Sequence, residues 1–186
     1  NGRGVPRSMF KETSDSVTLE NSRIIYTLGP TKFYRTSLLR NNNIDFPEDL
    51  RSAEDQLFTM KAYLNADKIA VLADKSYYYA AKREGEHMSS AYVSPEDFYK
   101  VMSLITEAIL DSPLDNKHKV LGYFIDRHFS FSRTNNFSLK IADDKKEVWM
   151  DALGDFIQKV PSEVDELVND SLKPLLYYAR LKDMKH

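Results

Sequence analysis

The sequence of 186 residues has no cysteine and little glycine or proline, with 6 and 7 residues of each. Without cysteine, disulfide bonds and thiolate metal sites are excluded. The low glycine and proline content excludes collagen-like and low-complexity chains. No apolar run approaches the roughly 18 residues that a membrane-spanning helix needs, so we expect no transmembrane segment.

The sequence also has no large excess of positive or negative charge, because it contains 26 basic and 28 acidic residues. A domain that binds nucleic acid through its overall field is strongly basic, so we expect no nucleic-acid partner. The sequence does contain 42% hydrophobic and 12% aromatic residues, as a globular protein does. It begins NGRGVP, without an initiator methionine or a signal-peptide pattern, and we expect a fragment of a longer protein.

Residues 1–92 mix strand and helix patterns, which is typical of α/β proteins. Strands are predicted from β-branched and aromatic runs at 23–27, 68–72 and 77–80. A short helix is predicted to start at Pro30 or Thr31 and to stop at the polar residues 40–43. A longer helix is predicted to start at Ser52, because the apolar residues that follow fall on one helical face.

Residues 93–186 carry helix patterns only. Ser94 is a favourable N-cap, and Pro95 fits the first helical position. Further helices are predicted at 117–130, 145–160 and 162–169, and from 172 onward. The single tryptophan, Trp149, is expected in the core, because Leu153 and Phe156 share its helical face. This half is therefore predicted to be an all-α subdomain.

Glu54 and Asp55 form a pair of carboxylates at the predicted start of a helix. One interpretation is structural: Asp55 closes a capping box on Ser52, and both acids complement the positive end of the helix dipole. The other is catalytic, because a general base needs a carboxylate held at a cleft edge by a rigid element. The residues alone leave both interpretations open.

The segment 82–90 is polar and offers two cations, a histidine and two serines. Such a loop can close over a phosphate-bearing ligand, with Arg83 and Ser89 donating hydrogen bonds. His87 can ligate a divalent metal or neutralise a leaving diphosphate. The alternative is a solvated connection between a strand and a helix.

A third group of cations lies in the helical half and includes Arg127 and Arg133. These residues can bind an anionic acceptor, although cations on a helix face are more often simply solvated.

Taken together, the segment 52–58, the predicted strands between 68 and 79, and the loop with Arg83, His87 and Ser89 resemble the second half of a GT-A glycosyltransferase of family 2. Within that family, residues 1–90 and 127–133 resemble the bacterial poly(ribitol-phosphate) N-acetylglucosaminyltransferases of wall teichoic acid. The resemblance implies an α/β fold in two parts. Residues 1–92 would be the C-terminal half of a Rossmann-like GT-A catalytic domain, and residues 93–186 the helical subdomain.

The resemblance also implies a reaction and its residues. N-acetylglucosamine would pass with inversion from UDP-GlcNAc to a ribitol hydroxyl of poly(ribitol-phosphate). Asp55 would be the catalytic base, with Glu54 as its partner. Arg83, His87 and Ser89 would bind the donor diphosphate, His87 would also join the shell of a Mg²⁺ or Mn²⁺ ion, and Arg127 and Arg133 would contact the acceptor.

Members of this family work in the cytoplasm, and the resemblance implies a place there, peripheral to the inner face of the membrane. Their Asp-x-Asp metal motif is missing from this chain, so we expect the chain to be inactive by itself and the parent protein, which could form a homo-oligomer, to be the enzyme. The alternative is a non-catalytic helical module of a larger cell-wall protein, in which residues 94–186 bind a partner or self-associate.

Overall fold

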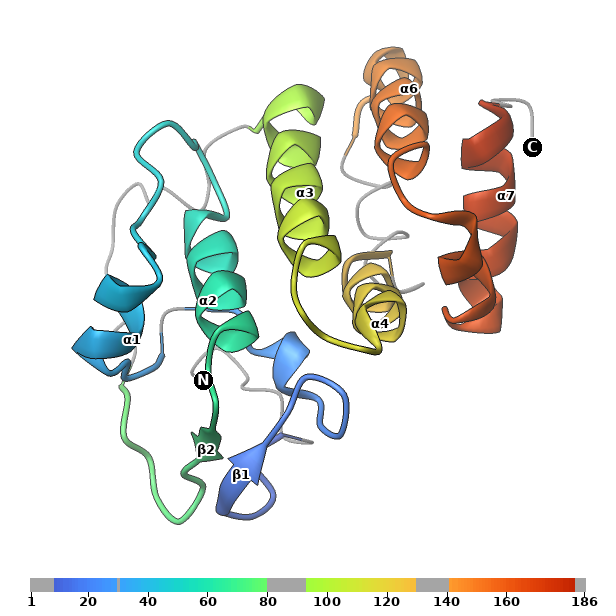
Figure 1. The fold of residues 1–186 in the computed structure, drawn as a ribbon. Helices are drawn as coiled ribbons and strands as arrows, with labels where there is room; N and C mark the ends of the chain where they lie inside the picture. Colours follow the sequence, from blue (N-terminus) through green and yellow to red (C-terminus); the bar gives the residue numbers. More distant parts are fainter. Residues whose placement is uncertain (1–8, 30, 80–92, 130–140, 183–186) are drawn as a thin grey trace. The chain divides into compact units, whose positions relative to one another are not determined.

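A computed structural model describes residues 9–29, 31–79, 93–129 and 141–182 (Figure 1). The chain divides into two units, residues 1–93 and residues 94–186. The first unit combines a small sheet with helices. The described part of the second unit contains helices and no strand, as its sequence pattern predicts.

The sheet of the first unit has two strands, β1 (Ser14–Val17) and β2 (Ile69–Val71), which pair antiparallel with Val17 opposite Ile69. The predicted strand at 68–72 is confirmed, whereas β1 was not predicted. The predicted strand at 77–80 is wrong for residues 77–79, and Ala80 lies outside the described residues. Tyr77 instead donates a hydrogen bond to Asp74 at 2.8 Å and stays exposed. Aromatic residues form strands only where a partner and an apolar face exist.

The predicted strand at 23–27 is also wrong, because residues 24–26 form the 3₁₀ helix η1 (Ile24–Tyr26). The Thr27 hydroxyl and its N–H both donate to the Ile24 carbonyl, at 2.7 and 2.8 Å. Such local bonds offer the backbone an alternative to a strand ladder. The apolar side chains of the run are still buried, and Ile25 has no exposed surface.

The described part of the first unit also contains two α-helices, α1 (Thr36–Asn41) and α2 (Glu54–Leu64). The predicted helix start at Pro30 or Thr31 is wrong, and the Phe33 side chain is 91% exposed. α2 forms as predicted, but it begins two residues after Ser52. Between the helices, the left-handed Asn43 (φ 50°) redirects the chain. A cluster of apolar side chains then joins α1, the connection and α2: Tyr34, Leu38, Leu39, Ile44, Phe58 and Ala62.

The first turn of α2 has an unusual N-cap. The predicted capping box is wrong, because Ala53 is the N-cap and no side chain caps it. Ala53 has a left-handed backbone (φ 56°, ψ 20°), and its carbonyl accepts the N–H groups of Gln56 at 3.0 Å and Leu57 at 3.3 Å. A non-glycine residue in this region costs about 1–2 kcal/mol. The local strain therefore sits immediately before Glu54 and Asp55.

The second unit begins with α3 (Pro95–Leu110), and its predicted cap is confirmed. The Ser94 hydroxyl accepts the Asp97 N–H at 3.1 Å, and Pro95 occupies the first turn. α3 packs against α4 (Lys117–Phe129) and α6 (Lys146–Ile157). Trp149 is buried, as predicted, with its ring centroid 6.1 Å from that of Tyr99.

The other elements described in the second unit are three 3₁₀ helices and an α-helix: η3 (Asp143–Lys145), η4 (Ser162–Glu166), η5 (Asp170–Leu172) and α7 (Lys173–Leu181). The helices predicted at 117–130, at 145–160 and from 172 onward are confirmed, with ends that differ by up to three residues. The helix predicted at 162–169 forms instead as a shorter 3₁₀ helix. In Figure 1, α6 and α7 lie side by side, and they are in contact.

Arg180 of α7 joins three segments of the second unit. Its Nε and Nη2 donate to the two carboxylate oxygens of Asp165 at 2.6 and 2.7 Å. Its Nη1 and Nη2 also donate to the carbonyls of Ile157 and Val160, both at 3.0 Å. Both side chains of the pair are mostly buried, with 22% and 25% of their surfaces exposed. One guanidinium thus fixes α7 to η4 and to the end of α6.

We predict that Arg180→Met lowers the free energy of unfolding of the second unit by about 2–3 kcal/mol, because Asp165 and two carbonyls lose their charged donor. The matched control is Lys182→Met, because Lys182 pairs with Asp155 at 2.6 Å but the two side chains are 46% and 68% exposed. The control is expected to cost less than about 1 kcal/mol. Urea unfolding followed by the fluorescence of Trp149 reports on this unit alone. Equal effects of the two substitutions would contradict the assignment.

We further predict that Ala53→Val weakens α2 and that Ala53→Gly does not. A β-branched residue is strained at positive φ, at a cost of about 1–3 kcal/mol, whereas glycine adopts this conformation freely and costs only about 0.5–1 kcal/mol of chain entropy. Amide hydrogen exchange across α2 measures the effect. Faster exchange in the glycine variant than in the valine variant would show that Ala53 is not left-handed.

Candidate active site

The two predicted site carboxylates occupy the first turn of α2. Glu54 and Asp55 are its first two residues, and both side chains are partly buried. The positive end of the helix dipole stabilises their ionised forms. Because the N-cap is Ala53, Asp55 does not close the predicted box on Ser52. Of the two interactions in the structural interpretation, the capping box is therefore absent, and the favourable interaction of the carboxylates with the helix dipole remains.

The surroundings of Asp55 come from the turn after η1 and from the segment before α1. A Cβ placed on Gly29 would lie 3.9 Å from Asp55 Oδ2, so this turn lies beside the carboxylate. Burial raises the pKa of Tyr34, its hydrogen bond with Thr59 lowers it in part, and the negative charge of Asp55 raises it further. The Gly29 turn and Tyr34 are therefore both in the neighbourhood of the Asp55 carboxylate.

Hydrogen bonds tie the Gly29 turn to α2. The Tyr63 hydroxyl donates to the Thr27 carbonyl at 3.2 Å and lies 3.1 Å from the Thr27 hydroxyl. Lys32 Nζ donates to the Gly29 carbonyl at 2.6 Å and lies 5.8 Å from the centre of the Tyr63 ring. These contacts hold the turn against one side of α2, which gives Asp55 the rigid support that a catalytic group requires.

The other predicted site residues lie outside the described residues or in the second unit. Arg83, His87, Ser89 and Arg133 lie outside the described residues. Arg127 lies on α4 in the second unit, where it is 7% exposed and its Nη1 is 2.6 Å from His128 Nε2. It is therefore a buried cation rather than one on a solvated helix face, and its role toward an acceptor stays a prediction.

The described residues do not complete a metal site. They contain no group of three or more histidine, aspartate and glutamate side chains that could hold an ion. The predicted ligand His87 is outside this part of the chain. In the same described part, no helix is both long enough and apolar enough to cross a membrane.

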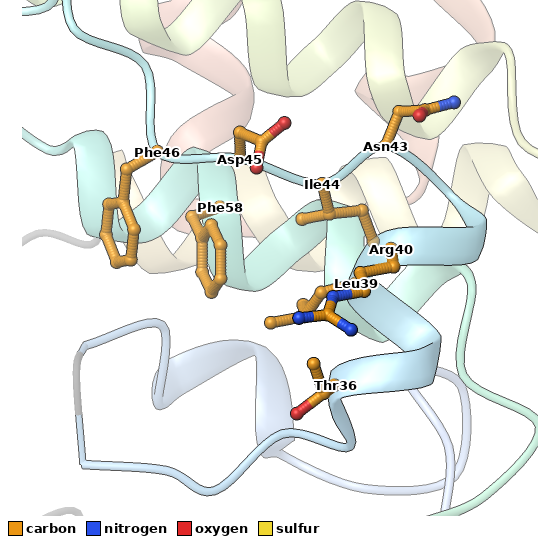
Figure 2. Close-up of a pocket in the computed structure, with 8 residues that line it drawn as sticks. All are labelled: Thr36, Leu39, Arg40, Asn43, Ile44, Asp45, Phe46 and Phe58. Carbon is orange, nitrogen blue, oxygen red and sulfur yellow. The ribbon is translucent and has the colours of Figure 1, made fainter.

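An open groove of about 520 Å³ lies one helical turn from the carboxylates (Figure 2). Its lining comes from α1, the connection and α2: Thr36, Leu39, Arg40, Asn43, Ile44, Asp45, Phe46 and Phe58. Figure 2 shows the Phe46 and Phe58 rings lying parallel, with centroids 4.0 Å apart. Arg40 extends from α1 toward this space, whereas Asn43 and Asp45 point away from it.

Sequence reasoning missed this groove because it treated Arg40 only as part of a helix stop. The sequence signal for the groove was the alternation of apolar and charged residues after Asn43. Ile44 is buried, Asp45 is exposed, and Phe46 is 53% exposed and packs against Phe58.

Comparisons with known proteins cover the whole chain. Residues 95–186 match the family model described as the glycosyl transferase TarS linker domain. Over 99% of its length the chain is 68% identical to poly(ribitol-phosphate) β-N-acetylglucosaminyltransferase TarS of Staphylococcus aureus strain Mu50, and it covers 32% of that protein. It is 50% identical over its full length to a poly(ribitol-phosphate) β-glucosyltransferase of Bacillus spizizenii, of which it covers 30%.

A solved structure also matches nearly the whole chain. The crystal structure of S. aureus TarS 1-349 in complex with UDP-GlcNAc superimposes on 98% of this chain with a TM-score of 0.92 and 68% identity, and the match covers 53% of that chain. The chain spans about a third of the length of the curated relatives. Over its whole length it therefore matches, at high identity, one segment of the longer TarS poly(ribitol-phosphate) glycosyltransferases, and its second half matches their linker domain.

Proposed function

We propose that this chain is the base-carrying segment, with the following linker domain, of an inverting glycosyltransferase that moves N-acetylglucosamine from UDP-GlcNAc to poly(ribitol-phosphate). The observation that supports it most is the 68% identity over 99% of the chain to the S. aureus enzyme of that name. The superposition on the structure of TarS in complex with UDP-GlcNAc supports UDP-GlcNAc as the proposed donor. A GT-A fold for the complete catalytic domain is part of the proposal.

Asp55 is the proposed base. Its carboxylate takes the proton of a ribitol hydroxyl while that oxygen attacks the anomeric carbon, and the bond from this carbon to the diphosphate oxygen breaks. Attack opposite the leaving group converts an α-linked donor into a β-linked product. Asp55 lies in the first turn of α2, where the helix dipole favours a negative charge. Glu54, beside it, orients Asp55 or contacts a sugar hydroxyl.

The leaving diphosphate is proposed to be held by Arg83, His87 and Ser89, through charge-assisted hydrogen bonds. A Mg²⁺ or Mn²⁺ ion also belongs to the proposal. Its ligands, His87 among them, would come from outside the described residues, and no step of the mechanism is assigned to it.

The acceptor is proposed to pass the helical unit, where Arg127 and Arg133 could contact its phosphates. The match of residues 95–186 to a linker domain supports a connecting role for this unit. A homo-oligomer of the parent protein and a place in the cytoplasm, at the inner face of the membrane, complete the proposal.

A second donor has support of its own, because the chain is 50% identical over its full length to a β-glucosyltransferase that is named for the same acceptor. The higher identity to the N-acetylglucosamine enzyme favours UDP-GlcNAc. Assaying the full-length protein with UDP-GlcNAc and UDP-glucose in parallel decides between the donors.

We predict that Asp55→Asn in the full-length protein lowers kcat by about 10²–10⁴-fold, because an amide cannot accept the proton. The KM for the donor is expected to change little, since Asp55 acts on the acceptor. Asp67→Asn is the matched control, because Asp67 is an exposed residue just after α2. Near-normal turnover of Asp55→Asn would exclude Asp55 as the base, and no transfer by the unsubstituted protein with either donor would exclude the function.

A further inference from the structure

The groove beside α2 has a mixed lining that suits one kind of ligand. The Phe46 ring is 53% exposed and packs flat on Phe58, which leaves an aromatic face at one end. The Arg40 side chain extends toward the same space (Figure 2). Aromatic faces pack against carbon-bound hydrogens, and a guanidinium binds phosphate oxygens. A ligand that alternates carbon chain with phosphate matches both.

Arg40 is available for such a ligand. It is exposed, and among the residues that the structure describes its guanidinium makes no ion pair or hydrogen bond. The one acidic residue of the lining, Asp45, points away from it (Figure 2). A phosphate in the groove would therefore not compete with a carboxylate already bound to Arg40.

The groove also lies at the correct place relative to the proposed base. Phe58 follows Asp55 by three residues on α2, and residues at this spacing lie on the same side of a helix with Cβ atoms about 5–6 Å apart. Tyr34 is near both residues: its ring packs edge-on against Phe58 with centroids 5.2 Å apart, and, after burial, the negative charge of Asp55 contributes to raising the pKa of Tyr34. Phe58 itself is only 5% exposed and supports the exposed Phe46 ring, so a polymer whose hydroxyl is at Asp55 would meet Phe46 and Arg40 in the groove.

We propose that this groove is a subsite for a polyol-phosphate repeat next to the one being glycosylated, with Arg40 binding its phosphodiester and Phe46 packing against its carbon chain. The inference rests on the proposed function and deepens it, because it names residues that bind a second repeat of the polymeric acceptor. An acceptor with a single repeat at Asp55 has no neighbouring repeat to place in the groove. Arg40 and Phe46 should therefore matter only for acceptors with several repeats.

The test compares acceptors of different length in the full-length protein. Arg40→Gln and Phe46→Ala are assayed with long poly(ribitol-phosphate) and with a single ribitol phosphate unit. Arg35→Gln is the matched control, because Arg35 is also exposed and immediately precedes α1 but does not line the groove. Thermal unfolding midpoints are recorded for every variant.

We expect Arg40→Gln to raise the KM for the polymer by about two- to fivefold, the effect of losing one exposed charged contact, and Phe46→Ala to raise it because the aromatic face is lost. Their kcat, their KM for the donor and their rate with the single unit should match the unsubstituted protein and Arg35→Gln. Arg40→Lys should recover part of the loss, because a lysine keeps the charge but not the planar guanidinium.

Three results would overturn the subsite. An unchanged KM for the polymer would show that the groove does not bind it. An equal loss with the single unit would place the effect at the reacting centre. A lowered unfolding midpoint with unchanged KM would show that another segment of the protein covers the groove. Each differs from failure of the proposed function, in which the unsubstituted protein transfers no sugar to either acceptor.

Discussion

The left-handed conformation of Ala53 is the constraint on which the candidate site depends. The Ala53 carbonyl accepts the first N–H groups of α2, as an N-cap carbonyl does, and Glu54 and Asp55 follow in the first turn without a side-chain cap. A serine cap at residue 52 would have started the helix earlier and engaged Asp55 in the box. The strain is balanced by the packing of α2, whose residues Leu57, Phe58 and Met60 are buried directly after the carboxylates.

Sequence patterns predicted the helices of the second unit because their signals are local. Ser94, Pro95 and the apolar stripe of α3 lie within one segment, and the cap forms as expected. Strands depend on partners that are far apart in sequence, as residues 14–17 and 69–71 are. The apolar run at 23–27 and the tyrosines at 77–79 both have high strand propensity. Local hydrogen bonds nevertheless fold residues 24–26 into a 3₁₀ helix. The tyrosines at 77–79 form no strand and remain exposed.

The candidate site was predictable in its chemistry and not in its geometry. The carboxylate pair at the start of a helix was predictable, since an acidic first turn is readable in sequence, whereas the role of Asp55 as a base came from the family resemblance and stays a prediction. Neither the left-handed Ala53 nor the tie between Tyr63 and the Thr27 turn has a pattern in the sequence, because both come from tertiary packing. The groove formed by Arg40, Phe46 and Phe58 was missed for the same reason, as it joins two helices through a positive-φ turn at Asn43.

The central claim is that Asp55 accepts the proton of the attacking hydroxyl. A crystal structure of the full-length protein with UDP-GlcNAc and a ribitol phosphate acceptor measures this directly, as the distance between an Asp55 carboxylate oxygen and the acceptor hydroxyl nearest the anomeric carbon. We predict a separation of about 2.6–3.2 Å, or one bridging water. A bound acceptor whose attacking hydroxyl contacts a different base, with Asp55 out of reach, would contradict the claim.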